Sequence, residues 1–96
     1  MLLSTLRAKR ETIAAAGQEF GARRLRVFGS VVHGEETPDS DIDFLVDLPP
    51  GYDLFMQRLP LAERLEEITG RHVDLIPEHE LNRHLRPYVL ADAIDL

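Results

Sequence analysis

The sequence predicts a small α/β protein of the α+β kind, in which helices flank a small mixed β-sheet. Three short apolar runs, at residues 24–28, 41–48 and 71–77, have strand-like composition and are bounded by glycine, proline or polar residues. Segments with helical spacing of apolar residues separate these runs. The 96 residues suffice for one domain with a thin core.

The first helix is expected over residues 2–20, and Gly21 ends it. Apolar side chains recur along this segment at near-helical spacing, at Leu3, Leu6, Ile13 and Phe20. Arg10 falls on the same stripe and interrupts it. The next segment, residues 24–28, alternates polar and apolar side chains and is therefore predicted to be the first strand.

A polar loop at residues 35–40 leads into the second strand, 41–48, which a Pro-Pro-Gly sequence ends. A helix is expected over residues 53–69, with a kink at Pro60 and a stop at Gly70. The third strand, 71–77, precedes a tail of one or two short helices, the last of which starts at Pro87. Core packing is favoured over a docking face for the apolar side chains of this tail, namely Leu81, Leu85, Tyr88, Val89 and Ile94.

Composition and charge exclude several classes of function. The formal net charge of −6 disfavours nucleic acid as a direct ligand, because an acidic surface does not attract a phosphate backbone. The absence of cysteine excludes disulfides and thiolate metal sites. The N-terminal stretch lacks the charge order of a secretory signal, and no apolar run approaches the roughly 20 residues of a membrane span. We therefore expect a cytoplasmic protein that does not associate with a membrane.

Three aspartates in the predicted strands are candidate metal ligands. Asp41 and Asp43 lie two residues apart and so point to the same face of a strand. Two like charges at this spacing repel unless a cation lies between them. Asp74 interrupts the apolar third strand, and it would join the pair if the two strands were neighbours. Such a cluster suits Mg²⁺ or Mn²⁺ and could hold two ions for phosphoryl or nucleotidyl transfer.

Each aspartate also has an ordinary explanation. Asp41 could cap a turn, and Asp74 could lie at a solvated strand edge. A calcium-binding loop is excluded, because its sixth position should be glycine and is Phe44, and its twelfth should be glutamate and is Pro50. The three carboxylates together are harder to explain without a cation.

A glycine-serine pair, Gly29 and Ser30, directly follows the first predicted strand. A helix that begins at Ser30 would offer free N–H groups to a phosphate, and Gly29 would let the backbone approach it closely. Taken alone, such a pair is more often a tight turn. The pair becomes informative about function because ten residues separate Ser30 from Asp41.

Gly29-Ser30, ten residues and then Asp41-x-Asp43 resemble the signature of the DNA polymerase β-like nucleotidyltransferase superfamily, and Asp74 resembles its third carboxylate. More narrowly, the stretch VFGSVVHGEETPDSDIDFLVDL is similar to the minimal nucleotidyltransferase (MNT) family, whose members are often antitoxins for HEPN-domain toxins. The resemblance covers nearly the whole chain. It implies a single nucleotidyltransferase domain over residues 1–96, with the α/β core of that superfamily.

The resemblance also implies an activity and its cofactors. The chain would transfer AMP from ATP to a tyrosine of a partner HEPN toxin, with two Mg²⁺ ions or with Mn²⁺, and would silence the toxin. Asp41 and Asp43 would bind both ions, and Asp74 would bind the catalytic ion and help to deprotonate the acceptor. The implied nucleotide-binding residues are Gly29, Ser30, Gly34 and Ser40.

One position departs from this pattern. Many members carry arginine where this chain has His33, and a histidine neutralises phosphates less well near pH 7. We therefore expect a lower rate or nucleotide affinity, with the class of reaction unchanged. The other histidines, His72, His79 and His84, are expected on the surface. Two alternative functions stay open, namely an antitoxin that neutralises its toxin by binding alone, and nucleotidyl transfer to a small molecule.

Overall fold

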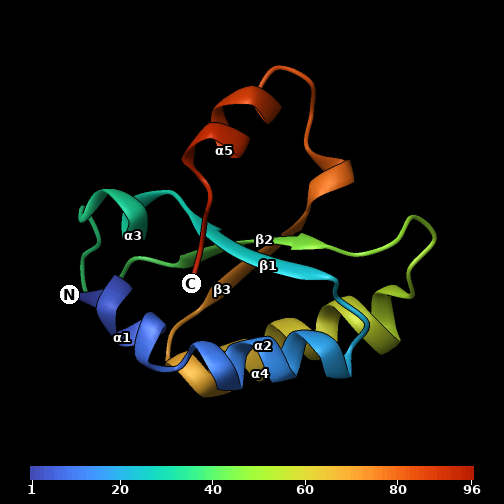
Figure 1. Ribbon diagram of the computed structural model, residues 1–96, viewed down its shortest axis with the longest axis horizontal. Coiled ribbons are helices and arrows are strands. Elements are labelled where there is room, and N and C mark those ends of the chain that lie inside the picture. The colour runs from blue at the N-terminus through green and yellow to red at the C-terminus, as the bar shows by residue number, and fades with distance from the viewer.

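A computed structural model describes all 96 residues, which form a four-stranded mixed sheet with helices on both of its faces (Figure 1). The strands are β1 (Arg24–Phe28), β2 (Ile42–Asp47), β3 (Val73–Pro77) and β4 (Ile94–Asp95). Their order in the sheet is β3-β2-β1-β4. β1 runs antiparallel to β2 and β4, whereas β2 and β3 are parallel. The predicted fold class is confirmed.

The core lies between one face of the sheet and a layer of helices, α1 (Leu2–Ala8), α2 (Arg10–Glu19) and α4 (Leu59–Thr69) (Figure 1). Alternation along the strands sends Val27, Phe44 and Leu75 toward this layer, where they are buried. The other sheet face is covered by η2 (Glu78–Glu80) and α5 (Arg86–Asp92). A one-turn helix, α3 (Ser30–His33), follows β1 at the end of the sheet.

The single helix expected over residues 2–20 is wrong, because the structure divides it into α1 and α2 at Lys9. Lys9 leaves the helical conformation, with φ −104° and ψ 12°, and its Nζ donates a hydrogen bond to the carbonyl of Ile68. A straight helix would turn Arg10 toward the core. The break at Lys9 turns α2 relative to α1. Arg10 is therefore exposed, while Leu6 and Ile13 are both buried.

The interruption expected near Pro60 is present. A five-residue π-helix, η1 (Leu54–Arg58), precedes α4, and Pro60 lies in the first turn of α4, where no backbone N–H is needed. The carboxylate of Asp53 accepts hydrogen bonds from the N–H groups of Phe55 and Met56 and so caps η1. α4 ends at Gly70, as expected.

The tail forms the expected short helices and also β4, which the sequence did not indicate. The expectation that its apolar side chains join the core is wrong for Leu85 and Tyr88, which are 55% and 76% exposed. α5 lies on the side of the sheet opposite the apolar layer, and none of its side chains is fully buried (Figure 1). Leu81 and Val89 are only half-buried, whereas Ile94 is partly buried and packs against the core, as expected.

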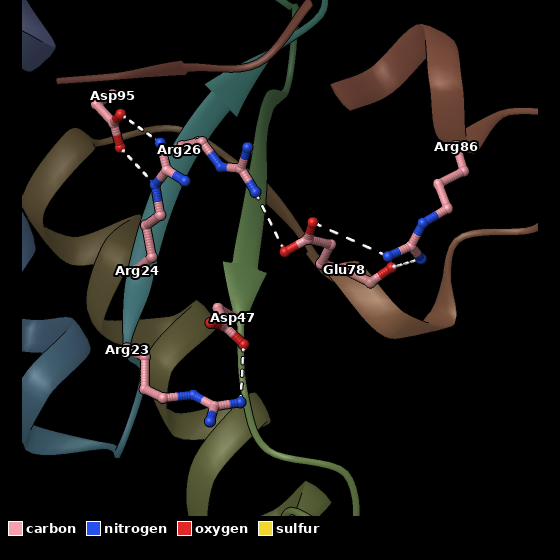
Figure 2. Close-up of polar contacts among 7 residues, drawn as sticks. All are labelled: Arg23, Arg24, Arg26, Asp47, Glu78, Arg86 and Asp95. Atoms are coloured by element: carbon pink, nitrogen blue, oxygen red, sulfur yellow. Dashed lines mark hydrogen bonds and ion pairs between the residues drawn. The ribbon is translucent and has the colours of Figure 1, made fainter. Parts of the chain in front are cut away.

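Four arginines attach the tail and the strand ends to this polar face (Figure 2). Glu78 lies between Arg26, at 3.2 Å, and Arg86, which also donates to the Glu78 carbonyl at 2.9 Å. Arg24 forms a two-bond pair with Asp95 of β4, and Arg23 pairs with Asp47 of β2. Arginine–carboxylate pairs therefore attach the tail to this face of the sheet, whereas apolar packing attaches the helices to the other face.

No helix of the chain combines the length and the apolar character needed to cross a bilayer.

Candidate active site

The three candidate carboxylates meet where β2 and β3 begin. Parallel pairing sets Asp43 directly beside Asp74. Asp41 immediately precedes β2, and the N–H of the intervening Ile42 donates to the carbonyl of His72, which fixes this register. Both strand aspartates occupy the sheet face opposite the apolar core, because Phe44 and Leu75 point into that core.

A histidine joins these carboxylates. Ligand atoms of Asp41, His72 and Asp74 all lie within 4.8 Å of one another, and Nδ1 of His72 is 3.2 Å from Oδ1 of Asp41. The expectation that His72 is a plain surface residue is therefore incomplete, because its side chain is exposed yet takes part in the cluster. The available signal was its spacing, since His72 lies two residues before Asp74 and so shares its face.

Asp43 is the carboxylate whose ionisation the fold disturbs most. Burial, the charge of Asp74, a hydrogen bond to Asp74 and the charge of Asp41 together raise the pKa of the Asp43 carboxyl from 3.8 to about 6. Desolvation and like charges both disfavour the ionised form. Burial is the largest of these effects, and the neighbouring carboxylates of Asp74 and Asp41 add to it.

Gly29 brings the glycine-serine turn against this cluster. Phe28, the last residue of β1, is the cross-strand partner of Asp43, so the turn begins beside that carboxylate. Gly29 has φ +77°, and a Cβ atom on it would overlap with Oδ2 of Asp43. Only glycine fits both conditions. Ser30, half-buried, then starts α3.

The loop between α3 and β2 contains the other two predicted nucleotide-binding residues. Gly34 ends α3 in the left-handed conformation, with φ +68°. The Ser40 hydroxyl accepts a hydrogen bond from the Thr37 N–H, and Arg71 donates to the carbonyls of Thr37 and Ser40. These contacts show Ser40 shaping the loop, and nucleotide contact at Gly34 and Ser40 stays a prediction.

The donor set of the cluster fits a divalent cation. It offers the carboxylate oxygens that Mg²⁺ and Mn²⁺ prefer and one imidazole nitrogen, which Mn²⁺ also accepts. A bound cation would also relieve the charge repulsion from Asp74 and Asp41, which, after burial, contributes to the raised pKa of Asp43. The arrangement can therefore hold a metal ion at the strand ends, with the glycine-serine turn beside it.

Comparison with known proteins agrees with this geometry. Residues 9–95 match the family described as nucleotidyltransferase domain. A protein of Thermococcus cleftensis named protein adenylyltransferase MntA is 38% identical over 77 residues, which cover 80% of this chain and 77% of that protein. A Methanocaldococcus jannaschii protein, also given an adenylyltransferase name, is 33% identical over 76 residues, covering 79% of this chain and 81% of that protein.

Solved structures give the same result. A structure described as that of a minimal nucleotidyltransferase superposes with a TM-score of 0.87 and 44% identity, covering all of this chain and 97% of the other. A toxin-antitoxin crystal structure with AMP-PNP superposes with a TM-score of 0.75 over 90% of this chain and 70% of the other, at 23% identity, and so shares the fold. The site geometry, the sequence match over residues 9–95 and these superpositions all indicate that the chain belongs to the nucleotidyltransferase domain family.

Proposed function

We propose that the chain is a metal-dependent adenylyltransferase that moves AMP from ATP to a tyrosine of a partner HEPN toxin and so acts as its antitoxin. The observation that carries this proposal is the meeting of Asp41, Asp43 and Asp74 beside Gly29. The adenylyltransferase name of the Thermococcus relative and the toxin-antitoxin crystal structure with AMP-PNP support the substrate and the partner.

Asp41, Asp43 and Asp74 would hold two Mg²⁺ ions, and the imidazole of His72, which lies beside Asp41, would offer a further ligand atom. Bound there, divalent ions supply the positive charge that stabilises a transferring phosphoryl group and its leaving oxygen. Gly29 and Ser30 would hold the triphosphate. Ser30 would offer its hydroxyl, and Gly29, whose own N–H donates to Asp92, would let the backbone approach the phosphates closely at the edge of the carboxylate cluster.

The transfer itself exchanges one phosphorus–oxygen bond for another. The acceptor oxygen bonds to the α-phosphorus of ATP as the bond to the β-phosphate oxygen breaks, and pyrophosphate leaves. The proton of the acceptor hydroxyl passes to the Asp74 carboxylate, which is exposed and so open to an incoming tyrosine. Asp43, half-buried behind it, is less accessible to a protein acceptor.

The test is transfer of label from ATP labelled at the α-phosphate, in the presence of Mg²⁺, to the protein encoded beside this chain. We expect a labelled tyrosine with the wild-type chain and none with Asp41→Asn/Asp43→Asn. Asp39→Asn, in the exposed loop before β2, is the matched control and should retain transfer. Absence of label with every nucleotide, from folded and metal-loaded protein, would end this proposal.

A second candidate is an antitoxin that acts by binding alone. It is favoured by Phe55 and Met56 of η1, which are 73% and 71% exposed, because apolar side chains of this kind can bind a partner without any chemistry. The Asp41→Asn/Asp43→Asn variant separates the two candidates. Full neutralisation of the toxin by this variant would favour binding alone.

A further inference from the structure

Asp92, the last residue of α5, contacts both ends of α3. Its Oδ2 accepts a hydrogen bond from the N–H of Gly29 at 2.8 Å, across 63 positions of sequence. Its Oδ1 lies 2.5 Å from Nε2 of His33. Gly29 precedes α3 and His33 is its last residue, so one carboxylate spans the whole one-turn helix.

The fold places Asp92 there through β4. Pairing of Ile94 with Val27 brings the chain that follows α5 alongside β1, and Figure 1 shows this segment descending from α5 onto the sheet. Asp92 lies two residues before Ile94, and Gly29 two residues after Val27. The Asp92 side chain therefore continues the contact between the two strands beyond the end of the short ladder. It is 22% exposed, which makes its hydrogen bonds stronger than those of a fully solvated carboxylate.

Val31 of α3 is fully buried and Val32 is partly buried against the core, so apolar packing holds the middle of this short helix. Asp92 holds its two ends, through Gly29 and His33. It also gives His33 a partner, because the imidazole faces Asp92 and a protonated ring forms an ion pair with it. His33 therefore has a charged partner of its own at the end of α3.

We propose that Asp92 is a positioning residue of the nucleotide site, which fixes the Gly29-Ser30 turn through Gly29 and His33 in the orientation that receives ATP. This proposal rests on the proposed function, in which that turn holds the triphosphate. Asp92 does not touch the reacting atoms. The C-terminal segment thus contributes to nucleotide binding, although the sequence signature lies entirely between positions 29 and 43.

The test measures the dissociation constant of a non-hydrolysable ATP analogue with Mg²⁺ for Asp92→Ala and Asp92→Asn. Because loss of a hydrogen bond to a charged group typically costs at least about a factor of ten, we expect about tenfold weaker binding for Asp92→Ala. Asp92→Asn keeps the size of the side chain and an acceptor for the Gly29 N–H. This variant should therefore fold normally and lose less of its affinity for the ATP analogue than Asp92→Ala does. Asp95→Asn is the matched control, because Asp95 lies in the same segment but pairs with the exposed Arg24.

Steady-state kinetics and a double-mutant cycle separate positioning from general stability. With ATP varied, Asp92→Asn should raise KM and leave kcat nearly unchanged, since Asp92 meets no reacting atom. In a His33→Ala background the Asp92→Asn effect on nucleotide binding should shrink, because one of the two contacts of Asp92 is with His33. Unchanged binding in both Asp92 variants would overturn the proposal. Tighter binding would also overturn it, because Asp92 would then occupy the place of a phosphate. If the wild-type chain binds no ATP, the proposed function itself fails.

Discussion

Asp43 shows at the level of one residue how the site and the stability of the fold oppose each other. Burial and the neighbouring Asp74 and Asp41 raise the pKa of its carboxyl from 3.8 to about 6. Below about pH 4 the group is protonated in both the folded and the unfolded chain, and it has no effect on stability. As the pH rises toward 6 the unfolded chain loses the proton first, so the folded state loses stability, and the penalty persists above pH 6.

Asp43→Asn should therefore stabilise the metal-free protein at pH 7. The full linkage would approach 3 kcal/mol, but the carboxyl is half-exposed and solvent screens it, so we expect a gain of about 1 kcal/mol. Urea unfolding at pH 4 and pH 7 measures this gain, which should be nearly absent at pH 4. Mg²⁺ should stabilise the wild-type chain more than the variant. Equal stability of both chains at pH 7 would contradict this account of Asp43.

Gly29→Ala tests the contact between the turn and the carboxylates. The positive φ of Gly29 and the overlap of a Cβ atom with Oδ2 of Asp43 should together cost about 2 kcal/mol and abolish transfer. Gly70→Ala is the comparison variant, because Gly70 has φ +71° and ψ 17°, in the left-handed helical region, and no atom within 4 Å of the Cβ position. The difference in unfolding free energy between the two variants measures the overlap together with the greater backbone strain at Gly29, whose ψ of −145° lies outside that region. Similar losses would mean that Asp43 moves aside freely and that the turn relaxes.

The site could be predicted from the sequence only where the pattern was local. Alternation within one strand predicted that Asp41 and Asp43 lie together, and the interrupted apolar run singled out Asp74. The spacing of His72, two residues before Asp74, places both side chains on one face, but its contact with Asp41 depends on the register between β2 and β3. The contact of Asp92 with Gly29 depends on the pairing of β4 with β1, which leaves no trace in the spacing of residues along the chain.

At the scale of helices and strands, the predicted bounds agree with the observed ones where residues in the sequence mark the boundary clearly. β1 was predicted at its observed bounds, and β2 and β3 within two residues, because glycine, proline and polar residues bound them sharply. The break at Lys9 has no such residue, and only Arg10 on the apolar stripe hinted at it. β4 has two residues, too few for any periodic pattern, and it exists because β1 offers it a free edge.

The N-terminus of η1 permits a prediction about a single element. Asp53→Ala removes the acceptor of the Phe55 and Met56 N–H groups and should cost about 1 kcal/mol of stability, as loss of an N-terminal cap does elsewhere. Transfer activity should persist, because η1 contributes no residue to the carboxylate cluster. Chemical denaturation measures the loss, and Asp39→Ala, in an exposed loop, serves as the control. A loss no larger than that of Asp39→Ala would show that η1 does not depend on its cap.

On the scale of the whole molecule, the two faces of the sheet are held by different forces. The helical layer buries the apolar core, whereas the opposite face joins η2, α5 and β4 to the sheet through arginine–carboxylate pairs (Figure 2). The candidate metal-binding carboxylates Asp43 and Asp74 share this second face. The fold can therefore keep like charges together there without disturbing its apolar core.

The ion pairs of the polar face should differ in how much they contribute to the stability of the fold, and the more buried pair should contribute more. Arg26 is only 11% exposed, and its Nε has no hydrogen-bond partner, so Glu78 supplies its counter-charge. Glu78→Ala leaves that guanidinium buried and unpaired and also releases Arg86, so it should cost about 2 kcal/mol, somewhat less than for a fully buried pair. Asp95→Ala breaks the exposed pair with Arg24 and should leave the melting temperature almost unchanged. Thermal unfolding of the two variants side by side measures the contrast. A larger loss for Asp95→Ala would mean that anchoring β4, rather than neutralising Arg26, holds this face together.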